Sequence, residues 1–132
     1  RGADYAAAKE SALKLKEISY IHADCYPAGE LKHGTISLIE KGSVVIAIAT
    51  DKELLNKTSG SILEVKARGA FTIGISSYEL DCCDITIKLP AADFYSPLLA
   101  TVACQLISYY AALHRGCDID KPRNLAKSVT VE

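Results

Sequence analysis

The sequence predicts an α/β fold: a three-layer αβα sandwich of the flavodoxin or Rossmann-like kind, built on a parallel sheet. Residues 43–49 (SVVIAIA) and 70–76 (AFTIGIS) are short, continuous apolar runs rich in β-branched residues. Such runs are typical of strands covered on both faces. Stretches of helical length and composition lie before, between and after them, and this alternation indicates a parallel sheet between helical layers.

The length of 132 residues, 49% of them hydrophobic, allows one domain with a substantial core and is too short for two. The chain begins at Arg1 and contains no methionine, which favours a fragment or a processed product.

The first expected element is a helix over residues 4–23. That stretch is rich in Ala, Leu, Lys and Glu and contains no Gly or Pro. Residues 24–34 carry Pro27, Gly29 and Gly34, so we expect a loop there with a short helical turn at 30–33.

The first strand, 43–49, is followed by a helix that Asp51 can cap and that Arg68 and Gly69 end. Residues 70–76 form the second strand, 77–84 a loop and 85–89 a third, shorter strand closed by Pro90. A long apolar helix over 94–114 ends at Gly116, and the residues after Cys117 are an extended tail. Three strands make a small sheet, which leaves open that a central strand is missing.

Charge and hydropathy exclude several functions. Fifteen Lys and Arg against sixteen Asp and Glu give a net charge of -1, so the basic surface of a nucleic-acid-binding protein is absent. No continuous apolar stretch approaches the roughly 18 to 20 residues of a membrane span, and the N-terminal sequence is unlike a signal peptide.

The five cysteines, at positions 25, 82, 83, 104 and 117, match no CxxC zinc or redox spacing, and their odd number favours reduced thiols in the cytoplasm. Glycine-rich phosphate loops are also absent. We therefore expect neither a metal nor a cofactor.

Glu10, Lys14 and Glu17 follow i, i+4, i+7 spacing and fall on one stripe of the first helix. A solvated face of ion pairs explains this spacing, and so does an acid/base cluster turned into a cleft. His33, in the loop, is of a type that exchanges protons near neutral pH, although an exposed loop histidine is the simpler interpretation. By composition alone, Lys127 is one surface lysine among many.

Four strings resemble the C-terminal end of the glucosamine-6-phosphate synthase family, the glutamine:fructose-6-phosphate amidotransferases. They are ALKLKEISYIHA (12–23), AGELKHG (28–34), EVKARG (64–69) and PRNLAKSVTVE (122–132). The resemblance implies that residues 1–115 are the second sugar-isomerase (SIS) subdomain without its first strand, and that 116–132 are a tail carrying a catalytic lysine. It also implies that a glutaminase domain and a first SIS subdomain are partners that this chain lacks.

The same resemblance implies a reaction in which fructose 6-phosphate and glutamine-derived ammonia give glucosamine 6-phosphate. Lys127 matches the imine-forming lysine, Glu17 the carboxylate that moves a proton between C1 and C2, and His33 the residue that assists ring opening. The substrate-binding positions match Glu10, Lys14 and Ala126. Because the family's histidine serves the neighbouring subunit, a homodimer is implied, and we expect the chain by itself to be inactive.

Two other classes of function remain open from the sequence. One is a non-catalytic SIS module that binds a sugar phosphate and regulates a partner. The other is a structural or dimerisation unit that uses the apolar helix 94–114.

Overall fold

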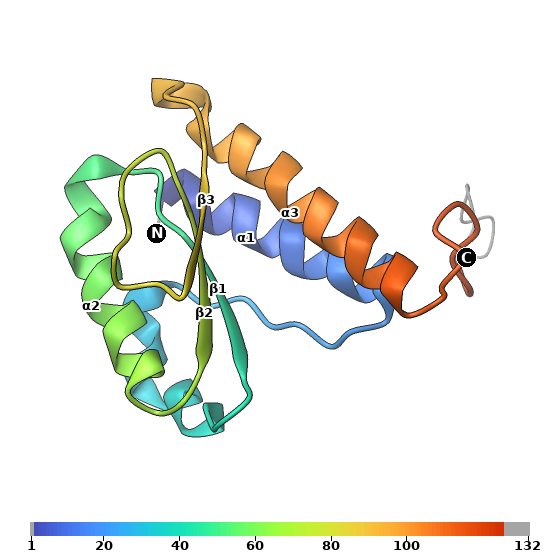
Figure 1. Cartoon of the computed structure of the whole chain (residues 1–132), viewed down its shortest axis with the longest axis horizontal. Coiled ribbons are helices and arrows are strands. Elements are labelled where there is room, and N and C mark those ends of the chain that lie inside the picture. Colours follow the sequence, from blue (N-terminus) through green and yellow to red (C-terminus); the bar gives the residue numbers. More distant parts are fainter. Residues whose placement is uncertain (1, 126–132) are drawn as a thin grey trace, which may run out of the picture.

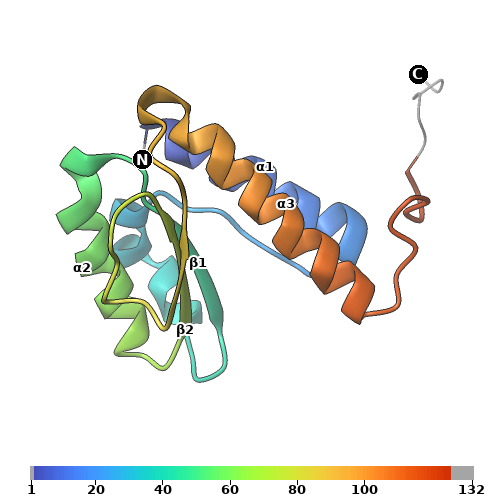
Figure 2. The ribbon, with the colours of Figure 1, turned by 45° about the horizontal axis from the view of Figure 1, so that its top comes forward.

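The computed structural model describes residues 2–125. Three parallel strands form one sheet in the order β1-β2-β3. The helices α1 and α3 cover one face of this sheet and α2 covers the other (Figures 1 and 2). The elements are β1 (Val44–Ile48), β2 (Phe71–Ser76), β3 (Ile85–Lys88), α1 (Gly2–Lys14), α2 (Leu55–Lys66) and α3 (Ser96–His114). The predicted three-layer sandwich is confirmed.

Local signals in the sequence place the ends of α2. The Asp51 carboxylate accepts a hydrogen bond from the Glu53 backbone N–H at 2.9 Å, at the start of the 3-10 turn Lys52–Leu54 that leads into the helix. After the helix, Gly69 has a φ of +93°, a left-handed conformation that glycine adopts without strain. The predicted cap and stop are therefore both confirmed.

The first helix is shorter than predicted. The α-helical hydrogen bonds of α1 end at Lys14, and a π-helical turn, Leu15–Ser19, completes the helix. Tyr20 then takes a left-handed conformation (φ 57°), which a right-handed helix cannot include. The expected end at residue 23 is therefore wrong, and the Ser19 hydroxyl, bonded to the Leu15 carbonyl at 2.6 Å, marks the true end.

Small side chains bring α1 and α3 close together. Ala7 and Ser11 of α1 are buried, as are the inward-facing residues of α3: Ala100, Cys104, Ser108 and Ala112. Ile75, Leu89, Ala100 and Cys104 form the buried cluster between α3 and the sheet. Cys104 is therefore a core residue, as its apolar surroundings in the sequence predict.

The outer face of α3 remains apolar and exposed. It presents Leu98, Val102, Leu106, Tyr110 and Leu113 to solvent. By length and composition, the helical stretch Asp93–His114 could cross a membrane, which the sequence-based expectation of no such span did not anticipate. Its inner face packs on α1 and the sheet, as a core helix of an α/β domain does.

An open, mainly apolar groove of about 610 Å³ runs along the free edge of β1. Every residue from Val44 to Ile48 lines it, and α1, α2 and α3 contribute its walls. At one end, the Asp4 carboxylate accepts hydrogen bonds from the Thr50 backbone N–H (2.9 Å) and hydroxyl (2.5 Å). Thr50 follows β1, so α1 begins at the carboxyl edge of the sheet.

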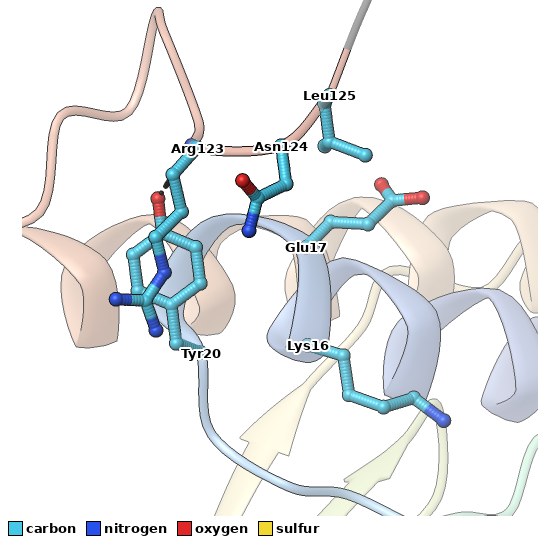
Figure 3. A pocket seen from close by; sticks show the side chains of 6 residues that line it. All are labelled: Lys16, Glu17, Tyr20, Arg123, Asn124 and Leu125. Carbon is cyan, nitrogen blue, oxygen red and sulfur yellow. Dashed lines mark hydrogen bonds between the residues drawn. The ribbon is translucent and has the colours of Figure 1, made fainter.

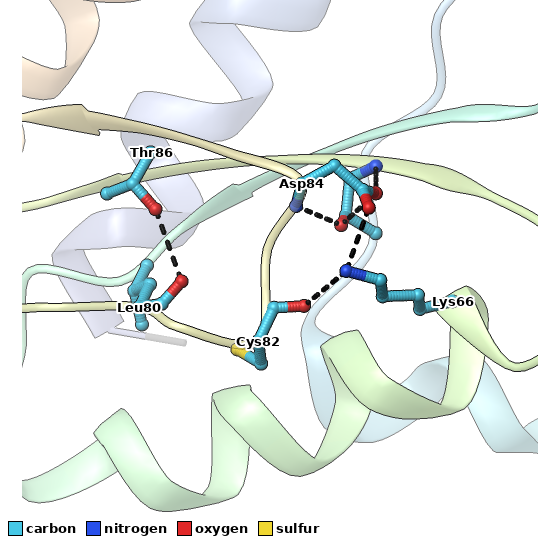
Figure 4. Close-up of polar contacts among 6 residues, drawn as sticks. Lys66, Leu80, Cys82, Asp84 and Thr86 are labelled. Carbon is cyan, nitrogen blue, oxygen red and sulfur yellow. Dashed lines mark hydrogen bonds and ion pairs between the residues drawn. The ribbon is translucent and has the colours of Figure 1, made fainter.

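A polar cluster lies at the amino ends of β2 and β3 (Figure 4). Lys66 at the end of α2 pairs with Asp84 at 2.8 Å and donates to the Cys82 carbonyl at 3.2 Å. Asp84 also accepts from the backbone N–H and the hydroxyl of Thr72. The hydrogen bond from Lys66, followed by those from Thr72, lowers the pKa of the Asp84 carboxyl to about 2.

We expect Asp84→Asn to lower the urea-unfolding midpoint of the chain at pH 7. A carboxyl whose pKa is lower in the folded state stabilises the fold above its ordinary pKa, and this stabilisation is lost as the pH falls from about 4 towards about 2. The midpoints of the wild-type and variant chains should therefore converge over that range. Asp81→Asn, in the same loop and exposed, is the control. A midpoint difference that stays constant down to pH 2 would contradict this assignment.

Candidate active site

Glu10, Lys14 and Glu17 form one charged cluster on the helix, as their spacing predicts. The Lys14 ammonium lies 2.5 Å from a Glu17 carboxylate oxygen and 3.4 Å from a Glu10 carboxylate oxygen. The side chains of Lys14 and Glu17 are 31% and 26% exposed. The hydrogen bond to Glu17 raises the pKa of the Lys14 ammonium above its ordinary value. The two carboxylates therefore stabilise the charged form of Lys14.

The start of the C-terminal tail lies beside Glu17 of this cluster. Glu17, together with Lys16 and Tyr20, forms one wall of an open pocket of about 340 Å³, and Arg123, Asn124 and Leu125 form the other wall (Figure 3). Residues more than a hundred positions apart in the sequence thus share one pocket. Of the three residues of the charged stripe, Glu17 lines this pocket, whereas Glu10 and Lys14 do not.

Two contacts join Tyr20 to Arg123. The Arg123 backbone N–H donates a hydrogen bond to the Tyr20 hydroxyl at 2.9 Å. The Arg123 guanidinium lies over the Tyr20 ring, 4.0 Å from its centroid, which is within the range of a cation–π contact. Earlier in the tail, the Cys117 thiol donates a hydrogen bond to the Ser19 carbonyl at 3.9 Å. The tail is thereby attached to the last turn of the first helix.

Lys127 and Ala126 lie outside the described residues. The last described residue, Leu125, lines the pocket with Glu17 and precedes Lys127 by two positions. The roles assigned to Lys127 and Ala126 from the resemblance therefore remain predictions.

His33 lies on a different part of the molecule from Glu17. The 3-10 helix Ala28–His33 packs against α2, because the Ser61 hydroxyl donates to the Ala28 carbonyl and Lys32 pairs with Glu64 at 2.5 Å. The helix α2 covers the face of the sheet opposite α1 (Figure 2). Within the described residues of a single chain, His33 and Glu17 are therefore not brought together.

Tyr20 and Arg123 are site residues that the sequence reasoning missed. A tyrosine after a helix and an arginine in a tail are ordinary surface residues by composition. Only the tertiary contact between them marks them as part of the pocket. Within residues 2–125, no group of three or more His, Cys, Asp or Glu side chains is arranged to hold a metal ion.

Comparison with known proteins places this chain in a family. The SIS domain model matches residues 1–115. The glutamine–fructose-6-phosphate aminotransferases (isomerizing) of Clostridium tetani and Bacillus subtilis are 55% and 57% identical to this chain over its whole length. The chain spans 22% of the length of these curated relatives.

Solved structures agree with the sequence comparison. The C-terminal domain of glucosamine-fructose-6-phosphate aminotransferase from Francisella tularensis is 42% identical and superposes with a TM-score of 0.83 over 92% of this chain and 36% of its own. A glucosamine-6-phosphate deaminase from Thermotoga maritima, 28% identical, has a TM-score of 0.76 over 95% of this chain and 37% of its own. The chain therefore belongs to the SIS domain family, and the curated relatives named above are glutamine–fructose-6-phosphate aminotransferases.

Proposed function

We propose that this chain is the C-terminal isomerase part of an enzyme that converts fructose 6-phosphate and glutamine-derived ammonia into glucosamine 6-phosphate. The observation that carries the proposal is the shared pocket of Glu17 and residues 123–125. A carboxylate suited to proton transfer lies beside the chain segment that leads directly to Lys127. The names of the relatives supply the substrate and the product.

In the proposed reaction, the Lys127 amine adds to the C2 carbonyl of the open-chain sugar and releases water, which gives an imine. Ammonia then adds to C2 and displaces the lysine amine, leaving the sugar with a C2 imine. Glu17 removes a proton from C1, which forms an enolamine with a C1 hydroxyl. Protonation at C2 and loss of the hydroxyl proton give the 2-amino aldose.

The charges of the site support this division of roles. Lys14 is ion-paired with two carboxylates and its pKa is raised, so its amine is a poor nucleophile. We propose that Lys14 and Glu10 bind and orient the sugar, with Ala126 beside it. The ion pair also fixes the direction in which the Glu17 carboxylate points.

His33 acts, in our proposal, in the pocket of a second subunit, where it assists ring opening. Its position on the α2 side of the sheet supports action between chains rather than within one. The exposed apolar face of α3 supports burial against further protein, in a homodimer or against the remaining four-fifths of a relative's length. A cytoplasmic location agrees with the five free thiols.

We also propose that residues 1–115 are a second SIS subdomain whose first strand precedes residue 1, and that residues 116–132 are the catalytic tail. The groove along β1 supports a missing strand, because it leaves apolar space between the helical layers for a sheet that is one strand wider. The position of the start of α1 at the carboxyl edge of the sheet also supports it. A strand that ended there would be parallel to β1.

Borohydride trapping tests the proposed function. The full-length protein is incubated with fructose 6-phosphate, reduced with borohydride and mapped by peptide mass. We expect a stable adduct on Lys127, because reduction converts an imine into an amine that does not hydrolyse. A folded, sugar-binding protein that gives no adduct would contradict the proposal and favour the regulatory SIS module.

A further inference from the structure

We propose that Tyr20 and Arg123 are positioning residues that hold the tail so that Lys127 meets the sugar in the Glu17 pocket. This inference rests on the proposed function. We call the pair the Tyr20–Arg123 clamp. It consists of the 2.9 Å hydrogen bond from the Arg123 backbone N–H to the Tyr20 hydroxyl and the guanidinium stacked 4.0 Å from the ring centroid.

The clamp joins the two segments that carry the reacting groups. Tyr20 follows Glu17 by three residues on the helix side of the pocket, and Arg123 precedes Lys127 by four on the tail side. Apart from the thiol contact of Cys117 with Ser19, the polar contacts between the helix and the tail in the described residues are those of the clamp. The separation of the two segments at the pocket therefore depends on Tyr20 and Arg123.

Tyr20 has an unusual backbone conformation at the point where it meets the tail. Its left-handed conformation ends the π-helical turn and differs from that of the helical residues before it. A non-glycine residue in this conformation is uncommon, and the side chain of this one contacts Arg123. Tyrosine suits the position because one side chain offers both an aromatic face and an oxygen that accepts a hydrogen bond.

A positioning role predicts a specific kinetic result. Loss of the clamp leaves Lys127, Glu17 and Lys14 chemically intact but frees the tail. The rate of imine formation should then fall while the binding of sugar phosphate changes little. Small displacements of a reacting group can cost up to about a hundredfold in rate, and we expect a fall of about tenfold for Tyr20→Ala or Arg123→Ala.

The test uses the full-length protein and the rate of borohydride trapping on Lys127 at saturating fructose 6-phosphate. Tyr20→Phe removes only the hydroxyl and should give an intermediate rate. Tyr5→Phe and Lys9→Ala are matched controls, because the Lys9 ammonium lies over the Tyr5 ring at 5.6 Å elsewhere on the same helix. Both controls should trap at the wild-type rate.

The outcomes separate this inference from the proposed function. If the wild-type protein is trapped and Arg123→Ala and Tyr20→Phe are trapped equally fast, the clamp has no positioning role and the proposed function stands. If no adduct forms in the wild-type protein, the proposed function fails and the clamp's role fails with it. Arg123 is exposed, so its replacement leaves the fold intact even if Tyr20→Ala does not fold.

Discussion

Lys127→Ala in the full-length protein is expected to abolish the formation of glucosamine 6-phosphate. The substitution removes the amine that forms the imine, and the nearby Lys14 is paired as a cation with Glu10 and Glu17. Loss of a covalent nucleophile lowers turnover on the order of a thousandfold or more. The measurement is product formed from fructose 6-phosphate and glutamine under saturating conditions.

The control for this prediction is Lys121→Ala. Lys121 is an exposed lysine of the same tail, and its backbone N–H donates a hydrogen bond to the Asp118 carboxylate at 3.0 Å. Its replacement should leave turnover near the wild-type value. Near-normal turnover of Lys127→Ala would show instead that no imine at this residue is needed.

The second large effect is expected for Glu17→Gln. Glutamine keeps the shape of the side chain and can still accept a hydrogen bond from the Lys14 ammonium, but it cannot take a proton from C1. Loss of a general base costs roughly a hundredfold to ten-thousandfold in rate. Exchange of the C1 proton with deuterated solvent should therefore fall by that amount, whereas sugar binding and the borohydride adduct on Lys127 should persist.

This combination of results identifies the role of Glu17. A lost adduct would place Glu17 in imine formation rather than in proton transfer, and unchanged C1 exchange would remove it from the chemistry. The matched control is Glu79→Gln, which alters an exposed carboxylate paired with Lys88, far along the sequence from the pocket. Its C1 exchange should equal that of the wild-type protein.

Local sequence signals were sufficient for most of the fold. The β-branched runs placed the strands to within one residue at each end, because β-branched side chains pack well on a pleated sheet. Asp51 and Gly69 likewise marked the ends of α2. The π-helical turn escaped prediction because Leu15–Ser19 has an ordinary helical composition, and its unusual geometry accompanies tertiary contacts of Ser19 and Tyr20 with the tail.

The site was predictable only in part. The helical period alone brought Glu10, Lys14 and Glu17 together, since residues three and four apart are neighbours on a helix. No local rule could place Arg123 on Tyr20, because the two are separated by 103 positions. Whether Glu17 faces open solvent or a pocket depended on that long-range contact, because the contact holds the tail beside the helix.

The helices α1 and α2 lie on opposite faces of the sheet, and this constrains any strand that leads into α1. Crossovers between parallel strands are almost always right-handed. Two successive right-handed crossovers with helices on opposite faces must step across the sheet in opposite directions. A strand entering α1 therefore belongs on the β2 side of β1, and the nearest position there is between β1 and β2.

With such a strand inserted, β1 would lie about 4.8 Å further out, in the groove that now borders its free edge. The hydrogen-bonded pairing of Val44 with Phe71 would give way to two new ladders, and β1 would become the outermost strand on that side. A full-length structure that kept β1 and β2 as direct neighbours beside such a strand would require a left-handed crossover.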